Sequence, residues 1–279
     1  MHLGVDVDGT DGLAPLSLAE NASLEIDGVR KVFRRRRNST EVTAIERTSL
    51  SVEDGEFVSI LGPSGCGKST LLRIVAGLLE ADTGTVRVRG SVVKEPSRHV
   101  GMMYQQPVLL PWRTVMANIM LPVEILGLNR APYKHRANEL IELAGLGQFV
   151  DRYPNELSGG MQQRVAFCRL LTPDPSVLLM DEPFGALDAL TREEVGFALL
   201  NIWDHDRKTV VFVTHSIQEA VVLSDRVVVM SRRPGRVIHE VRIDIDRPRT
   251  SETESSARCM ELSRELRCVL ASGEGTRRR

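Results

Sequence analysis

The residues best suited to chemistry lie together in the segment 59–70, which reads SILGPSGCGKST. Gly62 is followed, after four intervening residues, by Gly67, Lys68 and Ser69. Glycines allow a loop backbone to curl so that successive N–H groups point at anionic oxygens. Lys68 would reach the outer phosphates of a ligand as a point charge, and the Ser69 hydroxyl would contact a Mg²⁺ ion. This spacing predicts a phosphate-binding loop.

A strand and a helix must flank such a loop if it is to hold phosphate. An apolar run of β type, EFVSIL, occupies 56–61, and a run with helical apolar spacing, LLRIVA, occupies 71–76. The helix adds the positive end of its dipole to the anion site. We therefore expect the whole loop to contact the ligand, namely Gly62, Pro63, Ser64, Gly65, Cys66, Gly67, Lys68, Ser69 and Thr70.

Two carboxylates follow a continuous apolar run, VLLM, at 177–180. Such a run is typical of a strand buried on both faces of a parallel sheet, and ligands bind at the carboxyl edge of these sheets. Asp181 would hold the Mg²⁺ shell, and Glu182 would accept a proton from the attacking water or orient it. A second buried run, 209–214, ends at His215. A lone histidine is more often structural, but this position beside the site favours a functional contact.

A second anion site is predicted further along the chain. Ser158, Gly159 and Gly160 precede a run with helical spacing, and a serine hydroxyl with bare glycine amides at a helix start can bind an anion. A turn of this kind alone is a common helix cap. Following the phosphate-binding loop, however, the segment 157–163, LSGGMQQ, resembles the signature motif of ATP-binding cassette (ABC) proteins.

This resemblance covers about residues 23–245, with the motifs in the family's order. It implies an α/β fold, with a P-loop NTPase (RecA-like) core, an antiparallel β subdomain and an inserted α-helical subdomain. It also implies ATP and Mg²⁺ as cofactors. The family assembles as an ATP-dependent, head-to-tail homodimer, in which Ser158 and Gly160 of one subunit would cover the γ-phosphate held by Lys68 of the other.

Three more residues take roles from the same resemblance. Gln105 matches the family's Q-loop glutamine, which touches Mg²⁺ or water and links the core to the helical insert. His215 matches the switch histidine, which contacts the γ-phosphate. Asp188 lies in a segment, 185–188, that resembles the D-loop along the dimer seam, and the residues alone do not exclude an ordinary turn.

Further segments narrow the class: LLPWRTV at 109–115, PFGALDALTR at 183–192 and RPGR at 233–236. They look like the ATPase subunits of nitrate, sulfonate and taurine importers. This likeness implies an ATPase that powers import of a small anion, with integral-membrane permease subunits and, indirectly, a solute-binding protein as partners. Two residues depart from the family pattern. Tyr104 replaces the usual phenylalanine, and Ser216 replaces the acidic residue usual after the switch histidine.

Other functional classes stay open. They are an ABC ATPase for another solute, an exporter ATPase, and a cassette ATPase acting on DNA or ribosomes. The last group usually carries long coiled-coil insertions or tandem cassettes, and neither is visible in the sequence. The transported solute would never touch this chain, so the sequence does not identify it.

Composition limits the possible fold, partners and location of the protein. Hydrophobic residues make up 42% of the 279, enough for a core, and the formal net charge of −1 gives no reason to expect nucleic acid. The sequence contains no membrane-spanning apolar run and no secretory signal pattern, so we expect a cytoplasmic protein, peripheral on the inner face of the cell membrane. The cysteines show no metal-like clustering and are expected to be free thiols.

The predicted domain organisation has three parts. Residues 1–21 form a disordered tail, 22–245 the ATPase domain with its helical subdomain at about 106–165, and 246–279 a tail with a short helix that packs on the core. Strands are expected at 23–29 and 43–52, and helical structure from Thr114 to about Ala144.

Some aromatic and basic residues have two interpretations. Phe33 could stack on a nucleotide base or be a buried aromatic at a strand end. The arginine run 34–37 indicates a solvated hairpin tip, with contact to anionic lipid or ligand as the alternative. Trp112 could pack inside the helical insert or, with Leu110, line a groove for a short helix of a membrane subunit.

Overall fold

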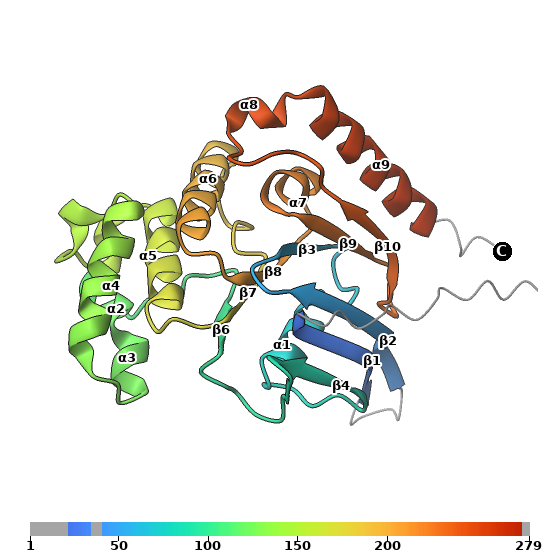
Figure 1. Cartoon of the computed structure of the whole chain (residues 1–279), viewed down its shortest axis with the longest axis horizontal. Helices are drawn as coiled ribbons and strands as arrows, with labels where there is room; N and C mark the ends of the chain where they lie inside the picture. The colour runs from blue at the N-terminus through green and yellow to red at the C-terminus, as the bar shows by residue number, and fades with distance from the viewer. Residues whose placement is uncertain (1–21, 35–40, 275–279) are drawn as a thin grey trace, which may run out of the picture.

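Two β-sheets and their surrounding helices make up the residues that the computed structural model describes, 22–34 and 41–274. The predicted N-terminal tail, most of the arginine run and the last five residues lie outside the described residues. Figure 1 shows the smaller sheet below the larger one, with one group of helices set apart at the left.

The smaller sheet is antiparallel and has four strands in the order β2-β1-β4-β5. Its strands are β1 (Ala22–Arg34), β2 (Glu41–Glu53), β4 (Thr83–Val88) and β5 (Ser91–Val92). β1 is longer than the predicted strand, because Phe33 continues the ladder by pairing with Val42 of β2. Leu24 and Ile26 are buried in β1, as the alternating pattern requires for a sheet with one covered face, and Val29 is buried after a register shift between Ile26 and Val29.

The larger sheet has six strands in the order β10-β9-β3-β8-β7-β6. Five of them are parallel, and β10 (Val237–Arg242) is an antiparallel edge. The parallel strands are β3 (Phe57–Leu61), β6 (Val100–Met103), β7 (Val177–Asp181), β8 (Thr209–Thr214) and β9 (Arg226–Met230). β3 and β8 are buried along their whole length, because helices and the small sheet cover both faces.

The register of the larger sheet brings the predicted site residues to one edge. Leu61, at the end of β3, pairs with Thr214 at the end of β8. Asp181, at the end of β7, pairs with Val213 of β8. The phosphate-binding loop, the two carboxylates and His215 each follow one of these ends, so they emerge side by side.

Helices cover the core sheet and form the separate group. Beside the core lie α1 (Lys68–Val75), α6 (Ala189–His205) and α7 (Ile217–Leu223). The separate group contains α2 (Val115–Ile119), α3 (Leu121–Ile125), α4 (Arg130–Leu143) and α5 (Gly159–Leu171), with short 3₁₀ turns at Gly147–Phe149 and Pro154–Glu156. The helical stretch predicted from Thr114 is thus three helices, and the proposed subdomain boundary at 165 falls within α5.

A buried asparagine holds the loop that carries Trp112. The Asn118 amide donates to the carbonyls of Leu110, Arg113 and Thr114 at 3.1, 2.9 and 3.1 Å. Its oxygen accepts a 2.7 Å hydrogen bond from the Leu110 N–H. Asn118 is fully buried, so these four bonds are needed to offset its desolvation. They fix the loop while leaving Trp112 71% exposed, which excludes the core interpretation of that residue.

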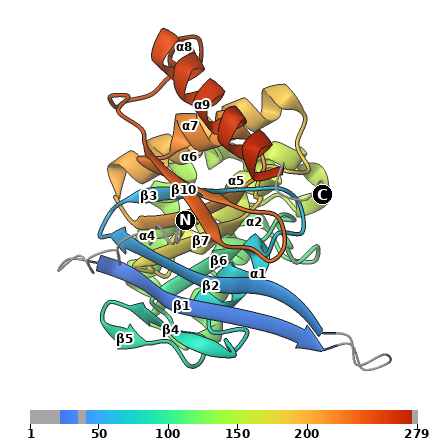
Figure 2. The same ribbon diagram turned by 90° about the vertical axis from the view of Figure 1, so that its right-hand side faces the viewer.

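The C-terminal region ends in α8 (Ser251–Glu254) and α9 (Ala257–Glu274). α9 is longer than the short helix expected, and Cys259, Leu262 and Leu266 bury its inner face in the main core. In Figure 2, α9 lies on the opposite side of the core sheet from the small sheet.

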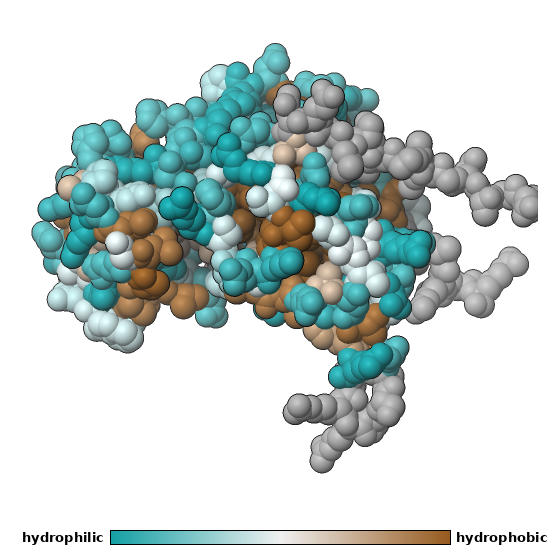
Figure 3. All heavy atoms as spheres, turned by 60° about the horizontal axis from the view of Figure 1, so that its bottom comes forward, coloured by the Kyte–Doolittle hydropathy of each residue, from teal (hydrophilic) through white to brown (hydrophobic). Residues whose placement is uncertain are grey.

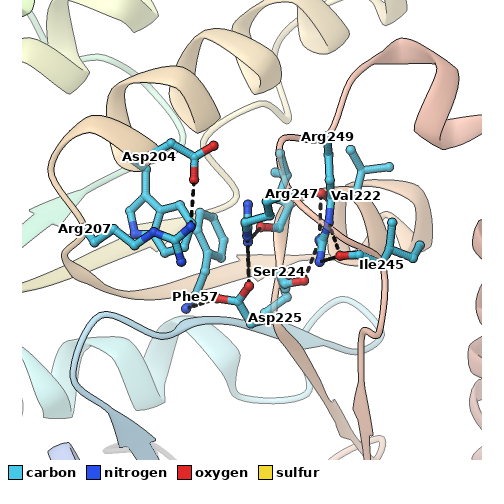
Figure 4. Close-up of polar contacts among 12 residues, drawn as sticks. Phe57, Asp204, Arg207, Val222, Ser224, Asp225, Ile245, Arg247 and Arg249 are labelled. Atoms are coloured by element: carbon cyan, nitrogen blue, oxygen red, sulfur yellow. Dashed lines mark hydrogen bonds and ion pairs between the residues drawn. The ribbon is translucent and has the colours of Figure 1, made fainter.

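Two arginines anchor the chain before α8, as Figure 4 shows. Arg249, 5% exposed, donates to the carbonyls of Val222 and Ser224 at 3.0 and 2.6 Å, next to the C-terminal end of α7. Arg247 donates to Asp225 at 3.0 Å and lies 4.3 Å from the ring centre of Trp203. A cation at a helix C-terminus is favourable, so this anchor stabilises the end of α7.

Candidate active site

The phosphate-binding loop runs from Gly62 to Gly67, between β3 and α1. Gly65 and Gly67 have φ values of 75° and 119°, a region that favours glycine. A Cβ on Gly67 would lie 2.7 Å from the Ala44 carbonyl oxygen, so a side chain there would collide with β2. The loop is therefore shaped both by its own glycines and by close contact with the small sheet.

Lys68 is the first residue of α1 and is only 4% exposed. Its Nζ donates to the carbonyls of Gly62 and Pro63 at 2.8 and 3.2 Å. The same nitrogen lies 3.6 Å from Glu182 Oε1. A buried ammonium held by loop carbonyls and one carboxylate can turn to an anionic ligand with little reorganisation.

Ser69 and Asp181 are joined across the site. The Ser69 hydroxyl donates to Asp181 Oδ1 at 2.8 Å. Burial, the largest cause, and the nearby charge of Glu182 raise the pKa of Asp181, although the bond from Ser69 acts in the opposite direction. A hydroxyl and a carboxylate at this spacing are the oxygen donors that Mg²⁺ takes, and a divalent cation would relieve the unfavourable charge on Asp181.

Glu182 and His215 form the outer part of the site. Glu182 Oε2 lies 3.0 Å from His215 Nδ1. Glu182 has a positive φ of 48°, which costs a non-glycine residue energy. The strained conformation is held by hydrogen bonds of 2.9 Å from its N–H to the Val213 carbonyl and 3.0 Å to its carbonyl from the Gly185 N–H. We name Lys68, Ser69, Asp181, Glu182 and His215 together the Lys68 site.

A pocket of about 340 Å³ opens over this loop. Phe33 contributes to one wall and is 42% exposed, so it is a pocket aromatic rather than a buried one. An exposed ring at that place can stack on a base. The lining consists of Phe33, Val42, Ala44, Ser64, Gly65, Gly67, Lys68, Ser69, Thr70, Glu182 and Arg233.

The second predicted anion site lies elsewhere. We name Ser158, Gly159, Gly160 and Asp188 the Ser158 end, and none of them is among the residues lining the pocket. Ser158 is the N-cap of α5 and accepts a 3.3 Å bond from the Met161 N–H.

Asp188 is the N-cap of α6, and the bonds it accepts from Thr191 lower its pKa. A Cβ on Gly160 would lie 2.5 Å from Thr191 Cγ2, which places the two helix starts in contact.

Gln105 lies in the exposed loop after β6 and also outside the pocket lining. Its amide packs on the turn after Glu182, since a Cβ on Gly185 would lie 2.7 Å from Gln105 Nε2. It is thus beside the carboxylates rather than bonded to them. No group of three or more His, Cys, Asp or Glu in the described ranges could hold a metal by itself.

Sequence reasoning missed three residues near the site. Arg233 donates to the Gly65 carbonyl from Nε and Nη2 at 3.1 and 2.8 Å. Gln163, buried in α5, donates to the Pro183 carbonyl. Glu219 bonds the Thr214 hydroxyl and lies 3.6 Å from Arg192. Arg233 and Gln163 lay in segments already noted and Glu219 did not, but the contacts of all three could not be read from those segments.

The phosphate-binding loop at the edge of a parallel sheet, with a lysine, a serine–carboxylate pair and a second carboxylate beside a histidine, defines a P-loop nucleotide-binding protein. The model of the ABC transporter family matches residues 45–185. The chain belongs to this family, and its α/β P-loop fold is confirmed.

Relatives and solved structures agree with that assignment. The chain is 44% identical to a taurine import ATP-binding protein, TauB, of Rhizobium johnstonii, over 91% of this chain and 98% of that protein. It is 43% identical to an aliphatic sulfonates import ATP-binding protein, SsuB, of Bacillus cereus, over 84% and 91%. A dimeric ATP-binding cassette in a post-hydrolysis state, bound to ADP and Pi, is 32% identical with a TM-score of 0.68, covering 80% of this chain and all of that one.

Proposed function

We propose that this chain is the ATP-hydrolysing subunit of an importer for a small anion of the sulfonate or taurine kind. The observation that carries the proposal is the Lys68 site, where a buried ammonium, a hydroxyl–carboxylate pair and a second carboxylate meet at one sheet edge. The taurine and sulfonate relatives named above support the choice of solute class. Nitrate and other small solutes remain the alternative cargo.

The chemistry follows from the positions of the side chains. Lys68 and the loop N–H groups neutralise the phosphates, which is the main way that proteins speed phosphoryl transfer. Glu182 takes the proton of the attacking water or aligns it, and His215 holds Glu182 through their 3.0 Å contact. Gln105, packed on the turn after Glu182, is suited to sense the ligand from the helical side.

A Mg²⁺ ion would be held by the Ser69 hydroxyl and the Asp181 carboxylate, with the nucleotide and water completing its shell. When bound, it would neutralise charge on the phosphates. The chain's own part is to keep these two oxygen donors 2.8 Å apart and half-buried before the ligand arrives.

The proposed active unit is a head-to-tail homodimer. At the Ser158 end, the N-terminus of α5 favours an anion, yet this end does not line the subunit's own pocket. A second copy could bring its Ser158 end over the pocket. The dimeric cassette structures with 32% and 33% identity support this assembly.

A membrane partner is proposed to dock on the helical group. None of the helices in the described ranges is long and apolar enough to cross a membrane. Several large apolar side chains in residues 108–126 are exposed, namely Val108, Trp112, Ile125 and Leu126. Figure 3 shows hydrophobic surface gathered over the helical region at the left of the view. Contiguous exposed apolar surface marks interaction sites, so we place a permease helix there, at the inner face of the membrane.

The Trp112→Ala substitution tests the docking surface. Because the ring is 71% exposed, its loss should change the free energy of unfolding by less than about 0.5 kcal/mol. A core tryptophan would cost roughly 3–5 kcal/mol. The isolated subunit should keep its melting temperature and ATPase activity but fail to co-purify with its membrane partner. A variant that assembles and supports uptake normally would contradict the docking proposal.

The solute is tested by uptake in a deletion strain. Labelled taurine, an alkanesulfonate and nitrate are supplied in turn, with the wild-type chain or the Glu182→Gln variant restoring the gene. We expect wild-type-dependent uptake of a sulfonated solute and none with the variant. Uptake of nitrate alone would redirect the solute class, and wild-type uptake without any ATP turnover would contradict the function.

A further inference from the structure

The turn between β9 and β10, residues 231–236, presses against the phosphate-binding loop. The Gly235 N–H donates to the Ala44 carbonyl at 2.9 Å, and the Gly235 carbonyl accepts a 2.9 Å bond from the Glu46 N–H. A Cβ on Gly235 would lie 2.2 Å from the Cys66 carbonyl oxygen. Only glycine fits at such a distance, so the turn is held between β2 and the loop.

Hydrogen bonds within the turn hold its shape. Ser231 donates its N–H to the Arg236 carbonyl at 2.9 Å, and its hydroxyl donates to the Pro234 carbonyl at 3.0 Å. The same hydroxyl accepts a 3.2 Å bond from the Arg236 N–H. A turn closed on itself and fixed to two other segments presents its remaining side chains with little loss of backbone entropy.

Arg233 is the side chain that this turn presents to the pocket. Its Nε and Nη2 both donate to the Gly65 carbonyl, at 3.1 and 2.8 Å. Two bonds to one oxygen orient the planar guanidinium, whose Nη1 carries two further N–H donors. Arg233 lines the same pocket as Phe33 and Lys68.

The charges around the pocket make this orientation significant. Lys68 and Arg233 are the cationic side chains among the residues that line it. Lys68 already faces the Glu182 carboxylate at 3.6 Å. Among the side chains that the structure describes in residues 22–34 and 41–272, the Arg233 guanidinium pairs with no carboxylate, so its charge remains available to an anionic ligand.

We propose that Arg233 is a nucleotide-binding residue, whose guanidinium contacts the phosphate chain from the Gly65 side while it holds the Gly65 carbonyl. The inference rests on the proposed nucleotide function and extends it by a second cation besides Lys68. A guanidinium gives charge-assisted hydrogen bonds to phosphate oxygens, and the positive charge is the part of this contact that a lysine ammonium would keep.

Equilibrium binding of ATP, ADP and AMP to the full chain tests the proposal. Titration calorimetry compares the wild type with Arg233→Gln, Arg233→Lys and the matched control Arg236→Gln, an exposed arginine of the same turn outside the pocket lining. Arg233→Gln should raise the Kd for ATP and ADP about tenfold, the size of one charge-assisted contact at a partly exposed site. The loss for AMP should be smaller, and Arg236→Gln should bind as the wild type does.

Arg233→Lys separates charge from loop shaping. Lysine keeps the positive charge but cannot make both bonds to Gly65, so a Kd within about threefold of the wild type supports phosphate contact. A lysine variant as weak as the glutamine variant overturns it, since the Gly65 bonds alone would then matter.

An unchanged Kd in Arg233→Gln also overturns the inference while leaving the nucleotide function intact, because wild type and Arg236→Gln would still bind ATP. A wild-type chain that binds no nucleotide overturns both.

Discussion

The Lys68 site and the Ser158 end are the two proposed anion sites, yet their polar groups are used differently. In the Lys68 site, side chains from separate segments bond one another: Ser69 bonds Asp181, and Glu182 contacts both Lys68 and His215. In the Ser158 end, Ser158 and Asp188 bond only backbone and hydroxyl groups a few residues away, and both are exposed.

This difference suits the Lys68 site to chemistry and the Ser158 end to assembly. Groups that are buried and mutually bonded are preorganised within one subunit, which is what catalysis by positioning requires. The exposed N-terminus of α5 instead offers its N–H groups to an anion from outside the subunit. The contrast agrees with the proposed dimer, in which the Lys68 site of one copy carries out the chemistry and the Ser158 end of the other copy covers it.

The largest expected effect comes from Glu182→Gln, which should leave ATP binding in place and lower turnover by at least ~100-fold. The amide keeps the shape of Glu182 but cannot accept the proton. The bound, uncleaved nucleotide should then hold a dimer, visible by sedimentation with and without MgATP. Full ATPase activity in this variant would remove Glu182 from the role of base.

Lys68→Ala is the matched contrast, because it acts on binding instead. Removing the buried Lys68 ammonium leaves the negative charge of the phosphates without a partner. ATP affinity should therefore fall, and no trapped dimer should form. If Lys68→Ala bound ATP as tightly as Glu182→Gln, the division between binding and chemistry within the Lys68 site would fail.

A smaller effect is expected from Ser158→Ala, which tests whether the Ser158 end of one copy contacts the nucleotide of the other. The subunit's own ATP affinity should stay within about twofold, because Ser158 is outside the pocket lining. Turnover should fall about tenfold, since one hydroxyl to the partner's phosphate is lost.

Losing the helix cap should cost about 1 kcal/mol of stability. Asn129→Ala removes a comparable cap from α4 and serves as the control. A similar loss of turnover in both variants would mean that capping alone matters.

The phosphate-binding loop and its carboxylates could be predicted from sequence because their geometry is local. Glycine spacing fixes the loop, and an apolar run followed by Asp181 and Glu182 fixes a strand end. Parallel pairing then forces these ends to one edge. The two positions of a residue such as Phe33, pocket or core, could not be separated, because exposure depends on how β1 pairs with β2.

The parts that sequence did not provide depend on contacts across the fold. Arg233 reaches Gly65 because Gly235 packs between β2 and the phosphate-binding loop. The spacing of residues 233–236 does not predict this contact. The predicted C-terminal helix was too short, because the apolar residues on the inner face of α9 stabilise it only through their burial against the main core. Exposure of Trp112 follows from Asn118, whose four bonds cannot be read from an isolated asparagine.

Glu219 joins the two regions and carries the smallest expected effect. Its carboxylate accepts a bond from the Thr214 hydroxyl, at the strand end before His215, and lies 3.6 Å from Arg192 Nε. Arg192 in turn donates to the Leu187 carbonyl at 2.9 Å, next to the Ser158 end. Glu219→Gln keeps the acceptor for Thr214 and removes the charge facing Arg192. Turnover should therefore fall by no more than a few-fold if this bridge aligns the regions.

The pH dependence of stability provides the sharper readout for Glu219. Burial, the largest cause, raises the pKa of Glu219 above its ordinary 4.5, so the folded protein holds this proton more tightly than the unfolded chain. Raising the pH from about 4.5 through the folded pKa therefore lowers the free energy of unfolding of the wild type, whereas glutamine has no proton to lose. The melting temperature of Glu219→Gln minus that of the wild type should rise over this window. Glu194→Gln, whose side chain is 68% exposed, is the exposed control, and a flat difference for Glu219→Gln across this window would contradict the predicted loss of stability.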